Sequence, residues 1–168
     1  MLCHYRCRRL AASGYVTASI DYRLLWSRLG HPRDILVAMA DARAAVRWLR
    51  RGEFNGTSLR VDPSRIAAFG SSAGGMTVVY MATMADNQTH DNNTNPYTNP
   101  DNPGYSSGIQ AAISLSGARF PPPAGLSVMG ASDPAYLDFH GCADPMVPYD
   151  CEDGCTCEGK RLDCNVFE

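Results

Sequence analysis

The strongest chemical signal in this chain surrounds Ser72, at the centre of the sequence Gly70-Ser-Ser-Ala-Gly-Gly75. It matches the pattern G-x-S-x-G, in which a serine sits on a sharp turn between a strand and a helix. The glycines two residues before and two residues after Ser72 allow the strand and the helix to approach each other. The turn exposes the serine hydroxyl above a sheet. The backbone N–H of Ala73 and the start of the helix then point at any oxyanion formed there. The pattern predicts a serine nucleophile; the alternative is a plain Gly/Ser-rich turn, or one that binds a phosphate.

The segments on either side of Ser72 have the patterns that this turn requires. Residues 65–69 are a short apolar run that stops at Gly70, which predicts a strand. From Ala73 to about Met84 an apolar stripe at helical spacing predicts a helix. We therefore expect a strand, a tight turn and a helix in this order.

The N-terminal third predicts a helix, a strand and a second helix. Residues 8–13 look like the end of a helix closed by Gly14, and the β-branched and aromatic run 15–22 predicts a strand. Apolar residues then recur every three or four positions from Ile35 to Leu49, with Pro32 suited to the first turn of that helix. A helix followed by glycine and a strand indicates an α/β fold.

Two more strands are expected in the second half of the chain, at residues 109–116 and 136–140. An Asn-Gly turn stands at 55–56, an Asn-rich surface loop at 86–104 and a proline-rich linker at 121–125. Four strands separated by helices predict a mostly parallel sheet with helices on both faces.

Five segments in the same order resemble the α/β-hydrolase family, in its carboxylesterase, lipase and feruloyl-esterase-like branch. The resemblance covers about residues 8–150 and rests on residues 14–24, Asp41-Ala-Arg-Ala-Ala-Val-Arg-Trp-Leu-Arg50, residues 61–75, Leu115-Ser-Gly-Ala118 and His140-Gly-Cys-Ala-Asp-Pro-Met-Val-Pro-Tyr149. It implies an α/β-hydrolase fold that is shortened at both ends.

The resemblance also implies an activity and a set of residues for it. The enzyme would be a serine hydrolase of carboxylic esters that works through an acyl-enzyme, with Ser72 as nucleophile and the Ala73 N–H in the oxyanion hole. Asp144 matches the acid of the catalytic triad, which orients a histidine; alternatively, Asp144 and Pro145 merely begin a turn. Its partner would be a small-molecule ester, and no cofactor or metal is implied.

Two parts of the family pattern have no match. The triad order is serine, acid, histidine, but no histidine follows Asp144, and the residues before Tyr15 hold no His-Gly-Gly oxyanion segment. Without a base a serine hydroxyl is a poor nucleophile, so we expect this chain to be weakly active or inactive. The alternative is an inactive hydrolase-like protein or fragment with a binding or structural role. The four histidines are the candidates for a substitute base, and His140 lies at a strand end near the expected active face, although a packed or hydrogen-bonded core side chain is its expected state. Solvated side chains are expected for His4, His31 and His90.

Length and composition limit the remaining classes. A chain of 168 residues with 45% apolar and 19% charged residues is expected to form one soluble domain, here a partial hydrolase domain at 1–150 with a cysteine-rich tail at 151–168. No apolar run reaches the roughly 18–20 residues of a membrane span. Residues 1–51 carry ten Arg and three Asp, a net charge of +7. No nucleic-acid motif accompanies this charge, and four of the arginines fall on the helix around 35–49, where we expect an ordinary solvated face.

The seven cysteines do not decide whether the protein belongs to an oxidising or a reducing compartment. Four of them lie in the tail with spacings that do not fit the C-x₂-C pattern of zinc sites, so disulfides are the first choice, and free thiols or a metal site the alternatives: Cys151, Cys155, Cys157 and Cys164. Asn55, Asn87 and Asn92 have the form of glycosylation acceptors, which weakly favours a secreted parent. Nothing in the first residues predicts a signal peptide.

Overall fold

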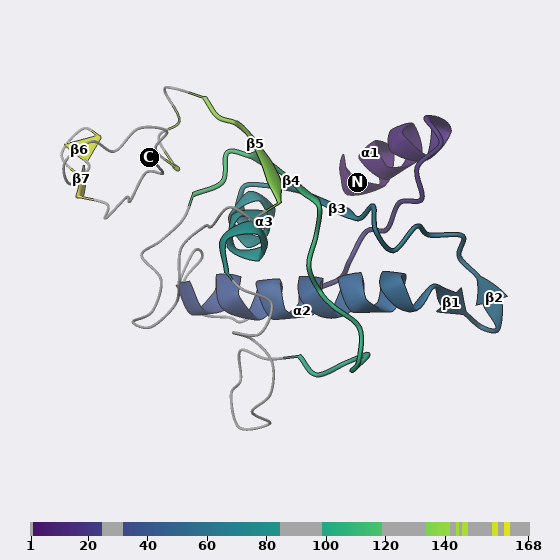
Figure 1. Cartoon of the computed structure of the whole chain (residues 1–168). Coiled ribbons are helices and arrows are strands. Elements are labelled where there is room, and N and C mark those ends of the chain that lie inside the picture. The colour runs from purple at the N-terminus through teal and green to yellow at the C-terminus, as the bar shows by residue number, and fades with distance from the viewer. Residues whose placement is uncertain are drawn as a thin grey trace.

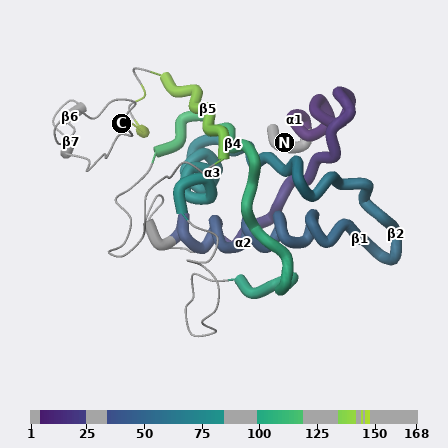
Figure 2. Tube along the Cα trace, viewed as in Figure 1, coloured from purple at the N-terminus to yellow at the C-terminus, as the bar shows by residue number. Residues whose placement is uncertain are grey.

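The computed structural model describes residues 2–24, 32–84, 99–118, 134–141, 144, 146–147, 156–157 and 160–161 (Figures 1 and 2). Its centre is a three-stranded parallel sheet in the order β3-β4-β5, formed by Ala67–Ser71, Ala111–Leu115 and Ala135–Phe139. The strands are in register, so Ser71, Leu115 and Phe139 end side by side. The predicted α/β fold with a parallel sheet is confirmed, and the residues that follow these strand ends share one edge.

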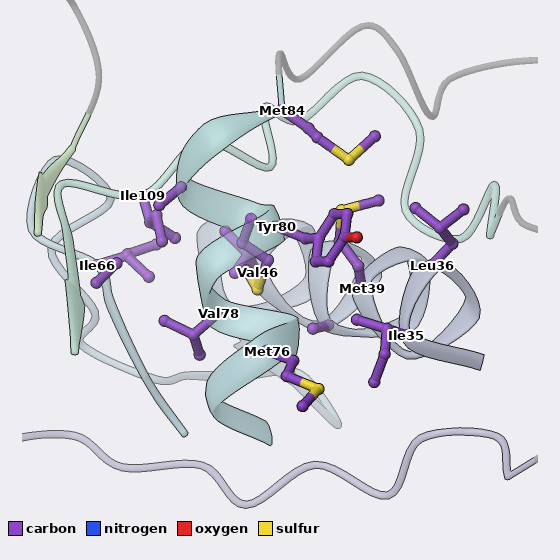
Figure 3. Close-up of a cluster of buried hydrophobic side chains, with 14 of the residues drawn as sticks. Ile35, Leu36, Met39, Val46, Ile66, Met76, Val78, Tyr80, Met84 and Ile109 are labelled. Carbon is purple, nitrogen blue, oxygen red and sulfur yellow. The ribbon is translucent and has the colours of Figure 1, made fainter. Parts of the chain in front are cut away.

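Two helices are layered on one face of the sheet. α3 (Ala73–Thr83) packs against β3 and β4, and α2 (Pro32–Arg51) packs against α3 (Figure 1). Every residue of α3 from Gly75 to Thr83 is buried, as expected for a helix that is apolar on all sides and lies inside a core. Tyr80 of α3 and Met39 of α2 are fully buried in the cluster that joins the two helices (Figure 3).

Arginines of α2 are part of this core, which corrects the expectation of an ordinary solvated face. Arg43 and Arg47 are each only 2% exposed. Arg43 donates to the Met84 carbonyl, and the Arg47 Nε donates to the Asp101 carbonyl at 2.8 Å. A buried guanidinium needs acceptors for its fork of donors, and here loop carbonyls supply them. These arginines therefore anchor the chain that leads into β4.

The opposite face of the sheet carries apolar side chains that are exposed to solvent. Phe69, Leu137 and Phe139 are 43%, 50% and 55% exposed. α1 (Leu2–Ala12) approaches this face, since the Arg6 guanidinium lies 5.2 Å from the centre of the Phe69 ring, a cation–π contact. Helices thus lie on both sides of the sheet, but the face against α3 is packed much more densely than the face that α1 approaches.

The predicted strand at 15–22 is wrong, because residues 15–22 form irregular chain. The Tyr15 N–H binds the Leu10 carbonyl at 3.2 Å and the Thr17 hydroxyl binds the Cys7 carbonyl at 3.2 Å, so this segment is tied to α1 instead of to a sheet. Residues 15–22 pair with none of the strands in the described parts of the chain. β-branched and aromatic residues form a strand only beside a partner, and none of the described strands lies beside residues 15–22 as such a partner.

The other predicted elements are found with small shifts. α1 ends just before Gly14, whose φ is +90°, and α2 and α3 occupy the predicted helices. Asn55 and Gly56, both with positive φ, connect β1 (Glu53–Phe54) to β2 (Thr57–Ser58) in an antiparallel hairpin. β3 begins and ends two residues later than predicted. Of the predicted loop, residues 99–104 are irregular, whereas 85–98 and the linker 121–125 lie outside the described residues.

Few of the cysteine predictions fall on described residues. Within the predicted tail, β6 (Thr156–Cys157) pairs antiparallel with β7 (Lys160–Arg161). Cys7 has a free, half-buried thiol, and the remaining cysteine side chains lie outside the described part. The division into 1–150 and 151–168 and the disulfides of the tail stay predictions.

Candidate active site at the carboxyl edge of the sheet

Ser72 is the single residue between β3 and α3, and its backbone is strained. Its φ and ψ are 54° and −123°, a conformation that costs a non-glycine residue on the order of 1–3 kcal/mol. Two hydrogen bonds hold it: the Ser72 N–H donates to the Leu115 carbonyl, and the Ser72 carbonyl accepts from the Met76 N–H, both at 2.9 Å. The residue is exposed. The turn thus presents the hydroxyl to solvent at the sheet edge.

The glycines near Ser72 have different tasks. A Cβ on Gly70 would overlap the backbone carbonyl of Gly74, so the strand and helix can cross only if residue 70 is glycine. A Cβ on Gly74 would meet nothing within 4 Å, whereas one on Gly75 would lie 3.0 Å from the Gly117 Cα. The expectation that a glycine on each side of Ser72 permits the approach holds for Gly70; on the helix side the close contact is made by Gly75.

Ala73 is the first residue of α3 and is exposed beside Ser72. The first N–H groups of a helix have no helical carbonyl to bind, and they carry the positive end of the helix dipole. The Ala73 N–H is therefore a suitable donor for an anionic oxygen next to the Ser72 hydroxyl.

Ser116 forms a second turn of this kind, which the sequence patterns did not indicate. It follows β4, has a φ of 50°, and donates its N–H to the Phe139 carbonyl at 2.8 Å. Its hydroxyl is one of the polar groups that lower the pKa of Asp144. The available signal was the segment Leu115-Ser-Gly-Ala118 of the family resemblance, which named no role for this serine.

Asp144 lies in the loop after β5 and is held as a carboxylate. Its Oδ1 accepts the N–H groups of Met146 at 2.9 Å and Val147 at 3.0 Å. The bonds from Val147 and Met146, helped by the charge of His140 and the Ser116 hydroxyl, lower the pKa of Asp144 below its ordinary value. The side chain is 19% exposed. Asp144 is thus ionised at neutral pH and open to a ligand or a neighbouring side chain.

The structure brings Ser72 and Asp144 to the same edge of the sheet. Ser72 follows β3 and Asp144 follows β5, with the end of β4 between them. Neighbouring strands are about 4.8 Å apart, so about 10 Å separate the two outer strands. The two residues therefore flank the end of β4 at this edge.

Of the histidines, only His140 has a described side chain, and that side chain is engaged. It is 2% exposed, and its Nε2 lies 2.5 Å from the Val147 carbonyl oxygen. Nε2 is therefore not available to take a proton from Ser72. The side chains of His4, His31 and His90 lie outside the described residues.

A separate hollow of about 420 Å³ lies on the outer side of α2, beside residues 20–23. It contains the ion pair between Arg23 and Asp41, with nitrogen and oxygen 2.8 Å apart. Burial alone would raise the pKa of Asp41, but hydrogen bonds from Arg23 and Asn99 outweigh burial and lower it. Because Arg23 and Asn99 already bind Asp41, we assign the polar side chains of this hollow a structural role.

Two further properties concern the residues that the structure covers. Among these residues no group of three or more His, Cys, Asp or Glu is placed to hold a metal ion. Their helices include none that is both long and apolar enough to cross a membrane.

Comparisons with known proteins support the α/β-hydrolase fold. The family model described as BD-FAE matches residues 3–119. Among solved structures, esterase 2 of Thermogutta terrifontis phosphoramylated by tabun is similar, with 28% identity, a TM-score of 0.65, and coverage of 86% of this chain and 55% of that one. The same esterase phosphorylated by paraoxon shows 29% identity, a TM-score of 0.64, and coverage of 86% and 54%. This chain thus spans little more than half the length of these esterases, and no curated protein matches it.

Proposed function

Because this chain belongs to the BD-FAE family, whose fold is that of the α/β-hydrolases, we propose that it carries the nucleophile and the acid of a serine ester hydrolase. One observation carries the proposal: a strained, exposed Ser72 and a carboxylate held by two backbone N–H groups stand at the same sheet edge, one strand apart. The substrate class is a carboxylic ester, as the similar solved proteins are esterases.

In the proposed reaction the Ser72 Oγ attacks the ester carbonyl carbon. The electron pair of the C=O bond moves to the oxygen, and the Ala73 N–H and the start of α3 stabilise that oxyanion. An imidazole oriented by Asp144 takes the Ser72 proton and returns it to the leaving alcohol as the acyl-enzyme forms. Water then attacks the acyl group by the same route, which releases the acid and restores the hydroxyl.

The group that limits the proposed reaction is the base that would accept the proton of the Ser72 hydroxyl. His140 Nε2 is bound to the Val147 carbonyl, and no other described side chain supplies an imidazole near Ser72. Loss of one triad member leaves only about 10³–10⁴-fold acceleration over water. We therefore propose that this chain by itself reacts slowly.

A fluorophosphonate probe tests the proposal because it phosphonylates activated serines. We expect slow labelling of the 168-residue chain, with the added mass located on Ser72 by peptide mass spectrometry. Ser72→Ala should abolish the labelling. Ser71→Ala is the matched control, since Ser71 is also exposed and precedes Ser72 directly, and it should leave the rate unchanged.

Free imidazole in the buffer sharpens the result. If the missing part is a base, imidazole should accelerate the labelling of the unchanged chain and have no effect on Ser72→Ala. Fast labelling without imidazole would contradict the proposed impairment, and equal labelling of Ser72→Ala would contradict Ser72 as nucleophile. The inactive hydrolase-like protein, the alternative from the sequence, predicts an unmodified Ser72 even with imidazole.

A further inference from the structure

We propose that His140 is a positioning residue for Asp144: its Nε2–H holds the Val147 carbonyl and thereby fixes the peptide whose N–H binds the Asp144 carboxylate. The inference rests on the proposed function, because only a triad acid would need this precision. It gives the buried histidine a task that is different from proton transfer to or from Ser72.

The protonation of the ring follows from its partner. His140 Nε2 lies 2.5 Å from the Val147 carbonyl oxygen. A carbonyl oxygen can only accept a hydrogen bond, so Nε2 must carry a proton. The side chain is 2% exposed, so water hardly competes for this bond. The Nε2–H is thus directed at the backbone of Val147.

Val147 links the histidine to the acid. Its carbonyl accepts from His140, and its own N–H donates to Asp144 Oδ1 at 3.0 Å. Its side chain is 8% exposed and belongs to the hydrophobic core. Val147 therefore holds the loop that carries Asp144 through its carbonyl, its N–H and its side chain, and His140 is the partner of the carbonyl.

The start of the loop that carries Asp144 is held by a separate hydrogen bond. The Asp144 N–H donates to the Gly141 carbonyl at 2.9 Å, and Gly141 follows His140 directly. The loop from 141 to 147 thus begins beside the His140 backbone and returns to the His140 ring. Removing the ring donor would open this loop on the Val147 side and leave the Gly141 side closed.

Two carboxylates flank the ring without replacing the Val147 bond. Asp144 Oδ2 lies 3.6 Å from Nε2, and Asp138 Oδ2, on β5, lies 3.7 Å from Nδ1. Both distances exceed that of a hydrogen bond. The hydrogen bond to the Val147 carbonyl is shorter, at 2.5 Å, and it connects His140 to the backbone that binds Asp144.

The unchanged chain gives the first test, by ¹⁵N NMR of the imidazole. We expect the Nε2 of His140 to be protonated, with an N–H proton that exchanges slowly with water. A ring protonated only at Nδ1 would overturn the proposal. This measurement needs neither catalysis nor a variant.

Two substitutions test the effect on the acid. His140→Phe keeps a ring but removes the donor, whereas His140→Gln places an amide N–H at a similar reach. In His140→Phe we expect the Asp144 pKa, followed by carboxyl ¹³C NMR, to rise toward its ordinary value and the Val147 amide to exchange about tenfold faster. His140→Gln should restore both values, which a purely space-filling role would not predict.

The outcomes separate this inference from the proposed function. A folded His140→Phe variant with an unchanged Asp144 pKa and unchanged Val147 exchange would overturn the positioning role. If His140→Phe does not fold, the tautomer in the unchanged chain and the values in His140→Gln decide. If the NMR results are as expected but Ser72 is never labelled, the proposed function fails while the arrangement of the loop stands.

Discussion

Two serines follow adjacent strands of this sheet with nearly the same positive φ, yet they have different surroundings. Ser72 and Ser116 have φ values of 54° and 50°. Each donates its N–H to the carbonyl at the end of the next strand, Leu115 at 2.9 Å and Phe139 at 2.8 Å. Ser72 is exposed at the start of an eleven-residue helix, whereas Ser116 is half-buried and its hydroxyl helps to lower the pKa of Asp144.

The comparison indicates that a serine with positive φ at a strand end has the setting expected of a nucleophile only where a helix follows it. After Ser72, the helix supplies N–H groups and a dipole for an oxyanion. Gly117 and Ala118, which follow Ser116, are not helical, and the Ser116 hydroxyl helps to stabilise the Asp144 carboxylate. The two turns also touch, because a Cβ on Gly75 would lie 3.0 Å from the Gly117 Cα. The Ser72 turn is thus in contact with the Ser116 turn, which braces it.

The largest predicted effect comes from Gly70→Ala, which acts on the Ser72 turn alone. The added Cβ would overlap the Gly74 carbonyl, and neither backbone can move without separating β3 from α3. We expect a loss of about 3 kcal/mol or more in the free energy of unfolding, measured by urea denaturation.

Gly74→Ala is the matched control, because its Cβ would meet nothing within 4 Å. Alanine is a better helix former than glycine, so this variant should be as stable as the unchanged chain or up to about 1 kcal/mol more stable. Equal stability of the two variants would show that the strand and helix are not in close contact.

A smaller loss is predicted for Gly117→Ala, which acts on the Ser116 turn. The added Cβ would meet the Ser114 Oγ, which can rotate away, and the Gly75 carbonyl carbon at 2.6 Å, which cannot. We expect a cost of about 1–3 kcal/mol in the same urea experiment, together with slower labelling of Ser72 because the two turns touch.

Gly141→Ala is the control on the third strand end, where a Cβ would meet nothing within 4 Å. It should change the free energy of unfolding by no more than about 0.5 kcal/mol. If Gly117→Ala is equally harmless, the brace between the two turns is not real.

The sequence indicated the first of these turns and not the second for a physical reason. Gly70 marks a crossing of β3 and α3 that tolerates no side chain, and the apolar runs on both sides of Ser72 mark the strand and the helix. The Ser116 turn also has a glycine, Gly117, and a backbone bond to Phe139, but no apolar stripe at helical spacing follows it in the sequence. Only the register of β4 and β5 brings Ser116 beside Asp144.

The strand predicted at 15–22 and the solvated face predicted for α2 failed for a related reason. β propensity describes a segment that suits a sheet, but it does not provide the neighbouring strand. Helical spacing places Arg43 and Arg47 on one side of α2, but it cannot show that the Met84 and Asp101 carbonyls come to meet them. Local pattern predicted the elements, whereas the partners depend on tertiary contacts.

The smallest predicted effect is that of Ser116→Ala, which tests whether the second turn supports the acid. The bonds that lower the pKa of Asp144 come first from the Val147 and Met146 N–H groups and last from the Ser116 hydroxyl. Loss of that hydroxyl should therefore raise the Asp144 pKa only in part, toward its ordinary value. Carboxyl ¹³C NMR of the titrating Asp144 measures the change.

The sign of the stability effect follows from the same shift. A carboxyl group whose pKa is lower in the folded state stabilises the protein above its unfolded pKa, and this contribution is lost as the pH falls through the folded pKa. Ser116→Ala reduces the shift, so acid unfolding should begin at a slightly higher pH. Ser13→Ala, which removes only a bond to the Arg9 carbonyl in α1, should leave the Asp144 pKa unchanged. If both variants leave the Asp144 titration unchanged, the Ser116 hydroxyl does not support the acid, and the two serine turns share a backbone state without sharing a site.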